Sequence, residues 1–253
     1  DGDFNVGPSS DKAMVDLIEE KRKSGVFLSV LGFGMGNYKD SKMEKLADKG
    51  NGNHAYIDTM QEAQKVFGQE FGGTLYTIAK DVKIQVEFNP AAVKGYRLIG
   101  YENRMLADED FIDDTKDAGE LGSGHTVTAL YEVIPVGVES SFLKPVHDLK
   151  YSNTKTVNST NELFTVKFRY KKPDGNKSTE ITKTVENATD EISSDFSFAA
   201  SVALFGLHLR KSKFTNNSGL EDVIRLAEQG LEKDEQGYRA EFIRLVKSYS
   251  NSL

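Results

Sequence analysis

Carboxylates gather in one short stretch of the chain, and a histidine follows them. The stretch reads MLADEDFIDDTKDAGE and includes Asp108, Asp110, Asp113, Asp114, Asp117 and Glu120. Carboxylate oxygens are preferred ligands of Ca²⁺, and a histidine such as His125 can serve as a general base beside a carboxylate. The run lacks the regular D-x-D-x-D-G spacing of an EF-hand loop.

Two interpretations of this stretch stay open. In the first, residues 108–125 form a Ca²⁺-binding or metal-dependent hydrolytic module with Asp113, Asp114 and Asp117 as metal ligands. In the second, the run is a solvated acidic loop, and His125 is a hydrogen-bonded structural residue. The other histidines lie in other predicted elements, so no second imidazole is expected beside it.

Glycines follow a buried apolar run, Val26 to Leu31, and offer a second kind of chemistry. Gly32, Gly34 and Gly36 lie between a predicted strand and a predicted helix, which is where a phosphate-binding loop would lie. The third glycine has the wrong spacing for G-x-G-x-x-G. A tight turn at the end of a strand explains the same glycines without a ligand.

The composition, the absent motifs and the net charge of the chain argue against several classes of function. The chain has no cysteine, which excludes disulfides, thiolate metal sites and cysteine nucleophiles. The G-x-S-x-G and H-E-x-x-H signatures are absent from the sequence. A net charge of −7 argues against a nucleic-acid-binding surface, which is usually basic.

The chain of 253 residues is 38% hydrophobic, enough for a packed core. No transmembrane segment is predicted, because the most apolar stretch, Phe196 to Leu209, is too short to cross a bilayer. The sequence begins at Asp1 without a methionine. We therefore expect a fragment or a processed product, whose targeting signal would lie upstream.

Residues 1–80 alternate between helical and strand patterns. We predict a helix over 11–23, a strand over 26–31, a helix opened by Ser41 and Glu44, a strand over 54–57, and a helix from Thr59 to Ile78. This order is typical of an α/β unit with parallel strands and a right-handed crossover. Two strands are too few to bury both faces of such a sheet.

From Asp81 onward, apolar residues recur at every second position. Residues 81–190 are therefore predicted to form an antiparallel β-sandwich. Its strands are expected at 82–88, 96–101, 125–135, 163–170 and 178–185, with a tight turn over 172–176. Residues 191–253 are predicted to be a helical segment that packs on the rest. Its first helix is apolar nearly all round and is expected to be buried, and Ser218 with Glu221 is predicted to cap the second.

Two groups of motifs resemble a known protein class. DGDFNVG, FLSVLGFGMGN and KMEKLADKGNGNHAYID resemble the second half of a von Willebrand factor type A (vWA) domain in bacterial, YfbK-like proteins. NPAAVKGYRLIGYENR, GSGHTVTALYEVIP and YRAEFIRLVK are similar to the C-terminal domain of unknown function of those proteins. The resemblance implies a partial doubly wound, Rossmann-like sheet followed by an antiparallel β domain and C-terminal helices.

The resemblance also implies a metal-ion-dependent adhesion site that binds Mg²⁺ at the carboxyl ends of the strands. Asp1 matches the aspartate of the family's Thr-Asp-Gly turn, while Asp3, Asn5, Gly34 and Asn37 are candidate binding residues in the matching segments. The D-x-S-x-S loop and the threonine loop are not in this sequence. One carboxylate cannot hold Mg²⁺, so the site is incomplete here, and no cofactor is expected in this chain.

The leading functional hypothesis is a non-enzymatic, adhesion-type binding module of a bacterial cell-envelope protein. Its partner would be a protein, and the resemblance implies an exported protein that is periplasmic or lipid-anchored. An exposed strand edge would also recruit a second copy or a retained N-terminal fragment. A purely structural assembly subunit is a further alternative.

Overall fold

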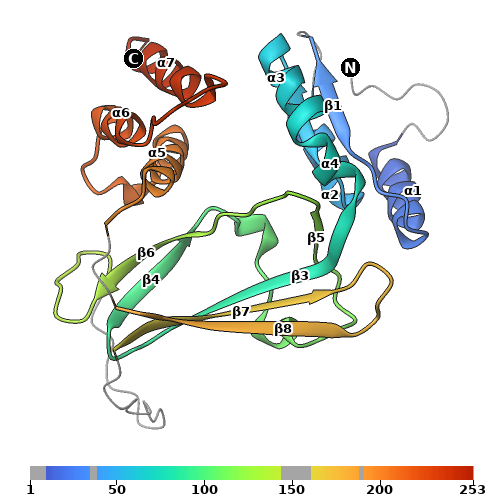
Figure 1. Cartoon of the computed structure of the whole chain (residues 1–253), viewed down its shortest axis with the longest axis horizontal. Helices are drawn as coiled ribbons and strands as arrows, with labels where there is room; N and C mark the ends of the chain where they lie inside the picture. The colour runs from blue at the N-terminus through green and yellow to red at the C-terminus, as the bar shows by residue number, and fades with distance from the viewer. Residues whose placement is uncertain (1–9, 35–38, 144–160, 188–190, 253) are drawn as a thin grey trace. The chain divides into compact units, whose positions relative to one another are not determined.

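The computed structural model describes residues 10–34, 39–143, 161–187 and 191–252 (Figure 1). The chain divides into two compact units. The first comprises Asp1–Gln85, Leu106–Thr126 and Val166–Lys183, and the second comprises Val86–Met105, Val127–Thr165 and Thr184–Leu253. Each unit is therefore assembled from segments that are distant in the sequence.

The first helices of the chain form largely as predicted. Helix α1 (Asp11–Lys23) begins after Ser10, whose hydroxyl accepts a hydrogen bond of 3.2 Å from the Ala13 N–H. Helix α2 (Asp40–Lys49) buries three apolar side chains, Met43, Leu46 and Ala47. The predicted capping box at Ser41 is wrong, because the helix already begins at Asp40, and its cap, Lys39, makes no side-chain cap bond.

A two-stranded parallel sheet lies beside these helices, as the α/β pattern predicted. Strand β1 (Val30–Phe33) pairs with β2 (His54–Ile57), and Val30 lies opposite His54. The predicted strand over 26–31 starts too early. Residues before Val30 bond to the turn after α2 instead, since the Leu28 N–H donates to the Gly50 carbonyl over 3.0 Å.

The helix predicted from Thr59 to Ile78 is shorter and irregular. Thr59 caps α3 (Met60–Gln64) as predicted, a π-helical turn η1 (Lys65–Gln69) follows, and α4 (Phe71–Leu75) ends the helical stretch. Glycine weakens a helix, and Gly68, Gly72 and Gly73 fall in this segment. Ile78 already belongs to a strand.

A four-stranded antiparallel sheet has the order β5-β3-β7-β8. Its members are β3 (Thr77–Phe88), β5 (Gly119–Gly122), β7 (Glu162–Lys171) and β8 (Ser178–Glu186). The register of β3 on β5 shifts around Asp81, whose backbone is left-handed with φ of 51°. Strand β5 was not predicted, because four residues with one large apolar side chain carry no clear period.

The remaining strands, β4 (Val93–Ile99) and β6 (Leu130–Pro135), form a separate antiparallel pair. The Phe88 ring lies 4.5 Å from that of Tyr96 and 5.4 Å from that of Tyr131. The described strands thus form one four-stranded and one two-stranded antiparallel sheet where a sandwich was predicted. Short 3₁₀ turns, η2 (Glu102–Arg104) and η3 (Asp108–Phe111), complete this region.

The C-terminal segment is helical, as predicted. It contains α5 (Ser194–Leu209), η4 (Lys213–Thr215), α6 (Leu220–Gln229) and α7 (Tyr238–Ser250). Phe205 of α5 packs edge-on against Phe242 of α7, with ring centroids 5.8 Å apart. The prediction that α5 is buried all round is wrong, since Phe196 is 53% exposed. Gly219, rather than the predicted Ser218, caps α6, and Asp222 accepts its N–H.

Candidate functional site

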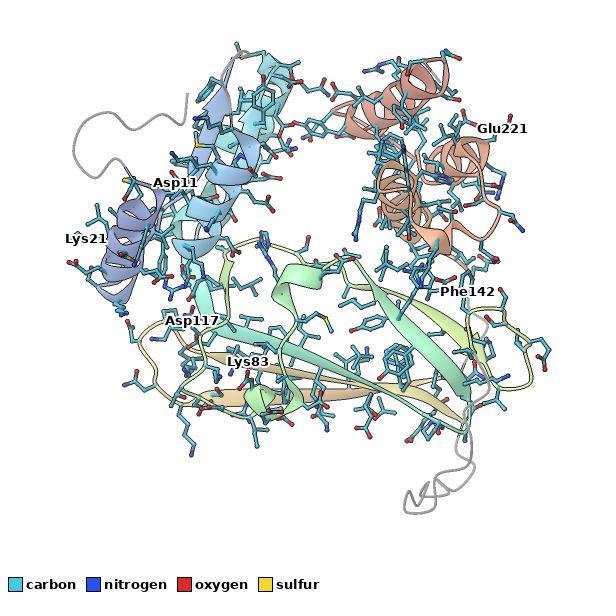
Figure 2. The ribbon with its side chains drawn as sticks, turned by 180° about the vertical axis from the view of Figure 1, so that it is seen from behind. Asp11, Lys21, Lys83, Asp117, Phe142 and Glu221 are labelled. Atoms are coloured by element: carbon cyan, nitrogen blue, oxygen red, sulfur yellow. The ribbon has the colours of Figure 1, made fainter. Side chains whose placement is uncertain are left out.

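Two buried lysines hold the acidic loop through its main chain, and one of them, Lys83, is labelled in Figure 2. Lys83 of β3 is only 3% exposed, and its ammonium donates to the carbonyls of Asp110, at 2.9 Å, and Asp113, at 2.5 Å. Lys171 of β7 donates to the Asp114 carbonyl at 2.7 Å. A buried ammonium must be surrounded by acceptors, so the loop wraps its carbonyls around these two cations.

The carboxylates that were predicted as metal ligands are engaged separately. Asp114 accepts from the Ser178 hydroxyl and from Arg169 at 3.0 Å, and these hydrogen bonds, Ser178 foremost, lower its pKa to about 2. The Asp113 carboxylate accepts from the Thr115 hydroxyl at 2.7 Å, which lowers the pKa of Asp113.

Asp117, the third predicted ligand, forms an ion pair of 2.9 Å with Arg22 of α1. In the part of the chain that the structure describes, no group of three or more His, Asp or Glu side chains is arranged to hold a metal ion. His125 lies exposed in the turn after β5, where its backbone N–H donates to the Gly122 carbonyl at 3.1 Å. The structure therefore does not gather the residues of the predicted hydrolytic site.

The candidate adhesion residues lie mostly outside the described residues, namely Asp1, Asp3, Asn5 and Asn37. Gly34 is described and follows β1 directly. Its backbone is left-handed, with φ of 76°, and its carbonyl accepts a hydrogen bond of 2.5 Å from the Tyr56 hydroxyl. A left-handed turn at the end of a strand favours a residue without a Cβ, which accounts for glycine at this position.

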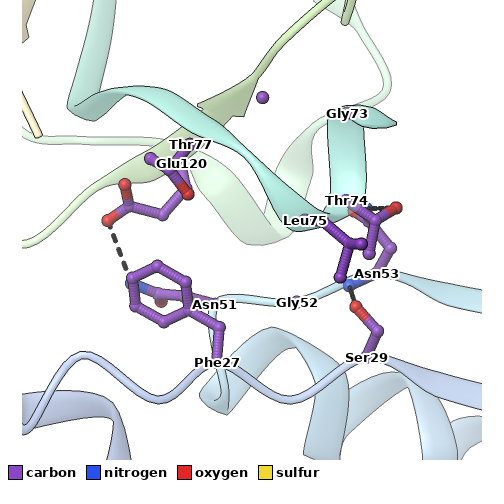
Figure 3. Close-up of a pocket in the computed structure, with 11 residues that line it drawn as sticks. Phe27, Ser29, Asn51, Gly52, Asn53, Gly73, Thr74, Leu75, Thr77 and Glu120 are labelled. Atoms are coloured by element: carbon purple, nitrogen blue, oxygen red, sulfur yellow. Dashed lines mark hydrogen bonds between the residues drawn. The ribbon is translucent and has the colours of Figure 1, made fainter. Parts of the chain in front are cut away.

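A small cavity lies at the opposite, amino ends of β1 and β2, where Ser29 and Asn53 precede the strands (Figure 3). Its volume is about 260 Å³. The lining residues come from four segments of the first unit: Phe27, Ser29, Asn51, Gly52, Asn53, Gly73, Thr74, Leu75, Thr77, Glu120 and Gly122. Most of the polar groups are amides and hydroxyls, and Glu120 is the single ionisable side chain among these lining residues.

Glu120 is the unusual group of this cavity. One carboxyl oxygen, Oε1, accepts a hydrogen bond of 3.3 Å from the Asn51 side-chain amide. The other, Oε2, is buried and has no hydrogen-bond partner among the described residues. Burial first, and then the charges of Asp81 and Asp117, raise the pKa of Glu120 to about 7, although Lys80 and Asn51 act in the opposite direction.

Two glycines allow the segments around the cavity to approach one another. A Cβ at Gly122 would lie 1.6 Å from the Gly73 carbonyl oxygen. A Cβ at Gly52 would lie 1.9 Å from the Leu28 carbonyl oxygen. Both contacts are with backbone, which cannot rotate away, so the shape of the cavity depends on glycine at both positions.

Sequence reasoning assigned Glu120 to the acidic run and Asn51 to a turn, and it did not bring them together. They are 69 positions apart and come from different elements. A signal was present in GELG, where a carboxylate lies between glycines in a short strand, because glycines in a strand often mark a close approach of another backbone. Only the fold shows which backbone approaches.

Comparison with known proteins defines the class of this chain. Residues 73–252 match the family described as "Uncharacterized protein YfbK, C-terminal", and the chain belongs to that family. The resemblance drawn from the motifs after residue 88 is thereby confirmed. A curated relative is the "Uncharacterized protein YfbK" of Escherichia coli (strain K12), which is 44% identical over 250 residues.

The alignment with this relative covers 98% of the chain but only 43% of the relative, so the chain spans less than half of that protein's length. No solved structure matches the chain. Across the described residues, no helix combines the length and apolar character needed to cross a membrane.

Proposed function

We propose that residues 1–80 are the second half of a vWA-type, doubly wound α/β domain, and that the protein is a non-enzymatic protein-binding module. One observation carries this proposal: beside the parallel pair β1–β2, apolar side chains are left exposed by the part of the chain that the structure describes. Parallel sheets are normally covered on both faces. A pair of strands with exposed apolar neighbours therefore suits a sheet that continues in a longer chain.

The uncovered surface follows the irregular helical stretch from α3 to α4. Met60, Phe67, Phe71 and Leu75 recur at intervals of seven and four residues, and they are 76%, 48%, 47% and 55% exposed. We call these four residues the apolar stripe. Phe33, at the end of β1, is 59% exposed as well. Large apolar side chains that are exposed at such a regular spacing usually mark a surface that something covers.

The occupant we propose for the apolar stripe is the upstream half of the same vWA-type domain. The E. coli relative is more than twice as long as the matched region, which leaves room for such a segment. That half would add strands beside β1 and supply the D-x-S-x-S and threonine loops. With Asp1 it would hold Mg²⁺, whose open position would take an acidic group of a protein partner.

Residues 81–253 are proposed to support this domain or transmit its state, since the acidic loop is fixed by Lys83 and Lys171 rather than free for chemistry. The proposed setting, by resemblance, is the cell envelope, with the protein exported and either periplasmic or lipid-anchored. A retained N-terminal fragment would cover the same surface as an uncut upstream half.

The apolar stripe gives a direct test. Replacing Phe67 and Phe71 together by serine should destabilise the 253-residue chain by about 2 to 4 kcal/mol, because about half of each ring is already buried there. The same change in a chain extended upstream through the expected D-x-S-x-S loop should cost at least about 2 kcal/mol more, because the exposed half of each ring would be buried as well. Urea unfolding measures both.

Ile181 of β8 provides the matched control, since it is also about half exposed, at 54%, but lies away from the apolar stripe. Ile181→Ser should have the same effect in both chains. Equal effects of the phenylalanine substitutions in both chains would contradict the proposal. Self-association of the 253-residue chain that the double substitution abolishes, without an effect in the extended chain, would point to a structural assembly subunit instead.

A further inference from the structure

Helix α5 is apolar nearly all round, yet the described residues cover only one side of it. That side packs on α6 and contains Ser201 and Leu207, which are buried (Figure 1). The other side carries Phe196, Val202 and Leu209, which are 53%, 44% and 49% exposed. A helix that is apolar all round is normally buried all round. The exposed side of α5 therefore needs a partner.

Gly206 of α5 has no structural explanation within one copy of the chain. Glycine weakens a helix relative to alanine. Among the described residues outside the helix backbone, a Cβ at Gly206 would meet no atom within 4 Å. A Cβ at Gly230 would instead lie 2.6 Å from the Ser194 carbonyl oxygen, so glycine is needed where α6 ends against α5. A second helix that crosses close to Gly206 would explain this glycine in the same way.

The exposed side of α5 has the same spacing in both directions along the helix. Its residues lie in pairs, each pair equally distant from one midpoint: Val202 and Ala203, Ala199 and Gly206, Phe196 and Leu209. At about 3.6 residues per turn, the two small residues of the second pair lie at the centre of this side, and the others flank it. When two copies of α5 run antiparallel, Ala199 of one copy comes opposite Gly206 of the other, and Phe196 lies at the level of Leu209. Each copy then contributes the same surface, as in a dimer with two-fold symmetry.

The charges at the two ends of α5 fit the same arrangement. Asp195 lies in the first turn, with its side chain 77% exposed, and Arg210 follows the last residue, with its side chain 58% exposed. They are equally distant from the same midpoint, so antiparallel pairing places Asp195 of one copy beside Arg210 of the other. Within one copy, Asp195 pairs with Arg239 and Arg210 with Glu102, and both groups can accept or donate further hydrogen bonds. A parallel pair would place like charges together.

We propose that the exposed side of α5 is the interface of a homodimer, in which α5 of one copy packs antiparallel on α5 of a second copy. A single helix of 16 residues supplies less area than a standard interface, so the Kd should be about 1 to 100 μM. The interface uses no residue of the apolar stripe. It is therefore independent of the proposed Mg²⁺-dependent domain.

Single cysteines test the geometry, because the chain has no cysteine of its own. Val202 lies next to the two-fold axis, so Val202→Cys should form a disulfide between two copies under mild oxidation. The two Leu209 side chains lie near opposite ends of the pair, about 20 Å apart, so Leu209→Cys should stay monomeric on a non-reducing gel. Both positions are about half exposed, which makes the comparison fair. Equal cross-linking at the two positions, or none at Val202, would overturn the proposal.

Sedimentation velocity over a concentration series measures the dimer directly. The unsubstituted chain should pass from monomer to dimer as its concentration rises. Ala203→Glu would place two carboxylates beside the two-fold axis and should weaken the dimer by at least about 100-fold. Leu245→Glu, at an exposed apolar position of α7, is the control and should leave the Kd unchanged. Self-association that the Phe67 and Phe71 substitutions abolish would place the interface on the apolar stripe and overturn the proposal.

Gly206→Ala separates the stability of the helix from the strength of the interface. At concentrations where the chain is monomeric, the alanine should raise the melting temperature, because it favours the helix. The same substitution should weaken the dimer about tenfold, because its Cβ would hold the two helices apart. A dimer that both Gly206→Ala and Ala203→Glu leave unchanged would overturn the proposal. So would a chain that is monomeric at every concentration, which would leave the exposed side of α5 to the upstream half or to a helix of another protein.

Discussion

At the scale of single residues, the acidic loop is explained by the two lysines that it surrounds. Lys83 and Lys171 are 3% and 7% exposed, and their ammonium groups occupy the carbonyl oxygens that a bound Ca²⁺ would use. A run of aspartates indicates a metal site only when its oxygens are free. In this loop the protein supplies its own cations from β3 and β7.

Lys83→Met should therefore destabilise the protein by about 2 kcal/mol, because the carbonyls of Asp110 and Asp113 would lose their buried donor. Lys183→Met, on the exposed strand β8, is the matched control and should change stability by less than about 0.5 kcal/mol. Denaturant unfolding compares the two. Equal effects would mean that Lys83 does not organise the loop.

Glu120 makes a prediction about stability and pH. Its folded pKa of about 7 lies above the ordinary value of 4.5, so the folded state binds the proton more tightly than the unfolded state. Stability should fall as the pH rises from about 4.5 to 7, by roughly 1 kcal/mol after allowance for partial exposure to solvent. Thermal melting should show this decline, and Glu120→Gln should remove it.

The contribution of Asp114 to stability changes with pH in the opposite direction from that of Glu120, and over a separate pH range. Its pKa is lowered to about 2, chiefly by the Ser178 hydroxyl, so its contribution is present above the ordinary pKa of 3.8 and is lost as the pH falls toward 2. A loss of stability in strong acid that Glu120→Gln leaves unchanged would belong to the carboxyl groups of lowered pKa, among them Asp114 and Asp113. Stability that rises between pH 4.5 and 7 in a Glu120-dependent manner would contradict the account of Glu120.

At the scale of elements, strand β5 depends on one glycine. Gly122→Ala would place a Cβ against the Gly73 backbone and should cost about 3 kcal/mol. Gly119→Ala on the same strand meets nothing within 4 Å and should be near neutral. Thermal or urea unfolding of the two variants checks this, and a tolerated alanine at Gly122 would show that the segments can separate without cost.

Local patterns predicted the elements whose signals are local. Helix α1 and strand β2 match their predicted ranges, and the caps at Ser10 and Thr59 are present. The start of β1 was predicted wrongly because the preceding residues form hydrogen bonds with a distant turn. The end of α4 was predicted wrongly because glycines interrupt that helical stretch. The spacing of apolar side chains along the sequence indicates neither effect.

The candidate site was less predictable than the fold. Glu120 looked like one more solvated carboxylate, since its hydrogen-bond partner Asn51 and the close approach of β5 to α4 at Gly122 come from distant segments. The adhesion residues could be assigned only through resemblance, and Asp1 lies outside the described residues. Chemistry that depends on contacts between distant segments does not leave a local pattern.

At the scale of the whole molecule, we propose that this chain holds half of a Mg²⁺-dependent binding domain. The most direct measurement is thermal melting with and without Mg²⁺, for the 253-residue chain and for the chain extended upstream through the D-x-S-x-S loop. A site filled at about 100 times its dissociation constant adds about 2.7 kcal/mol to the free energy of unfolding.

We predict that the melting temperature of the extended chain rises by about 5 to 10 °C with Mg²⁺, while that of the 253-residue chain does not change. An extended chain that does not respond would contradict the proposal of a divided Mg²⁺-dependent domain. A 253-residue chain that responds equally would also contradict it, and would move the metal to residues that this chain already contains.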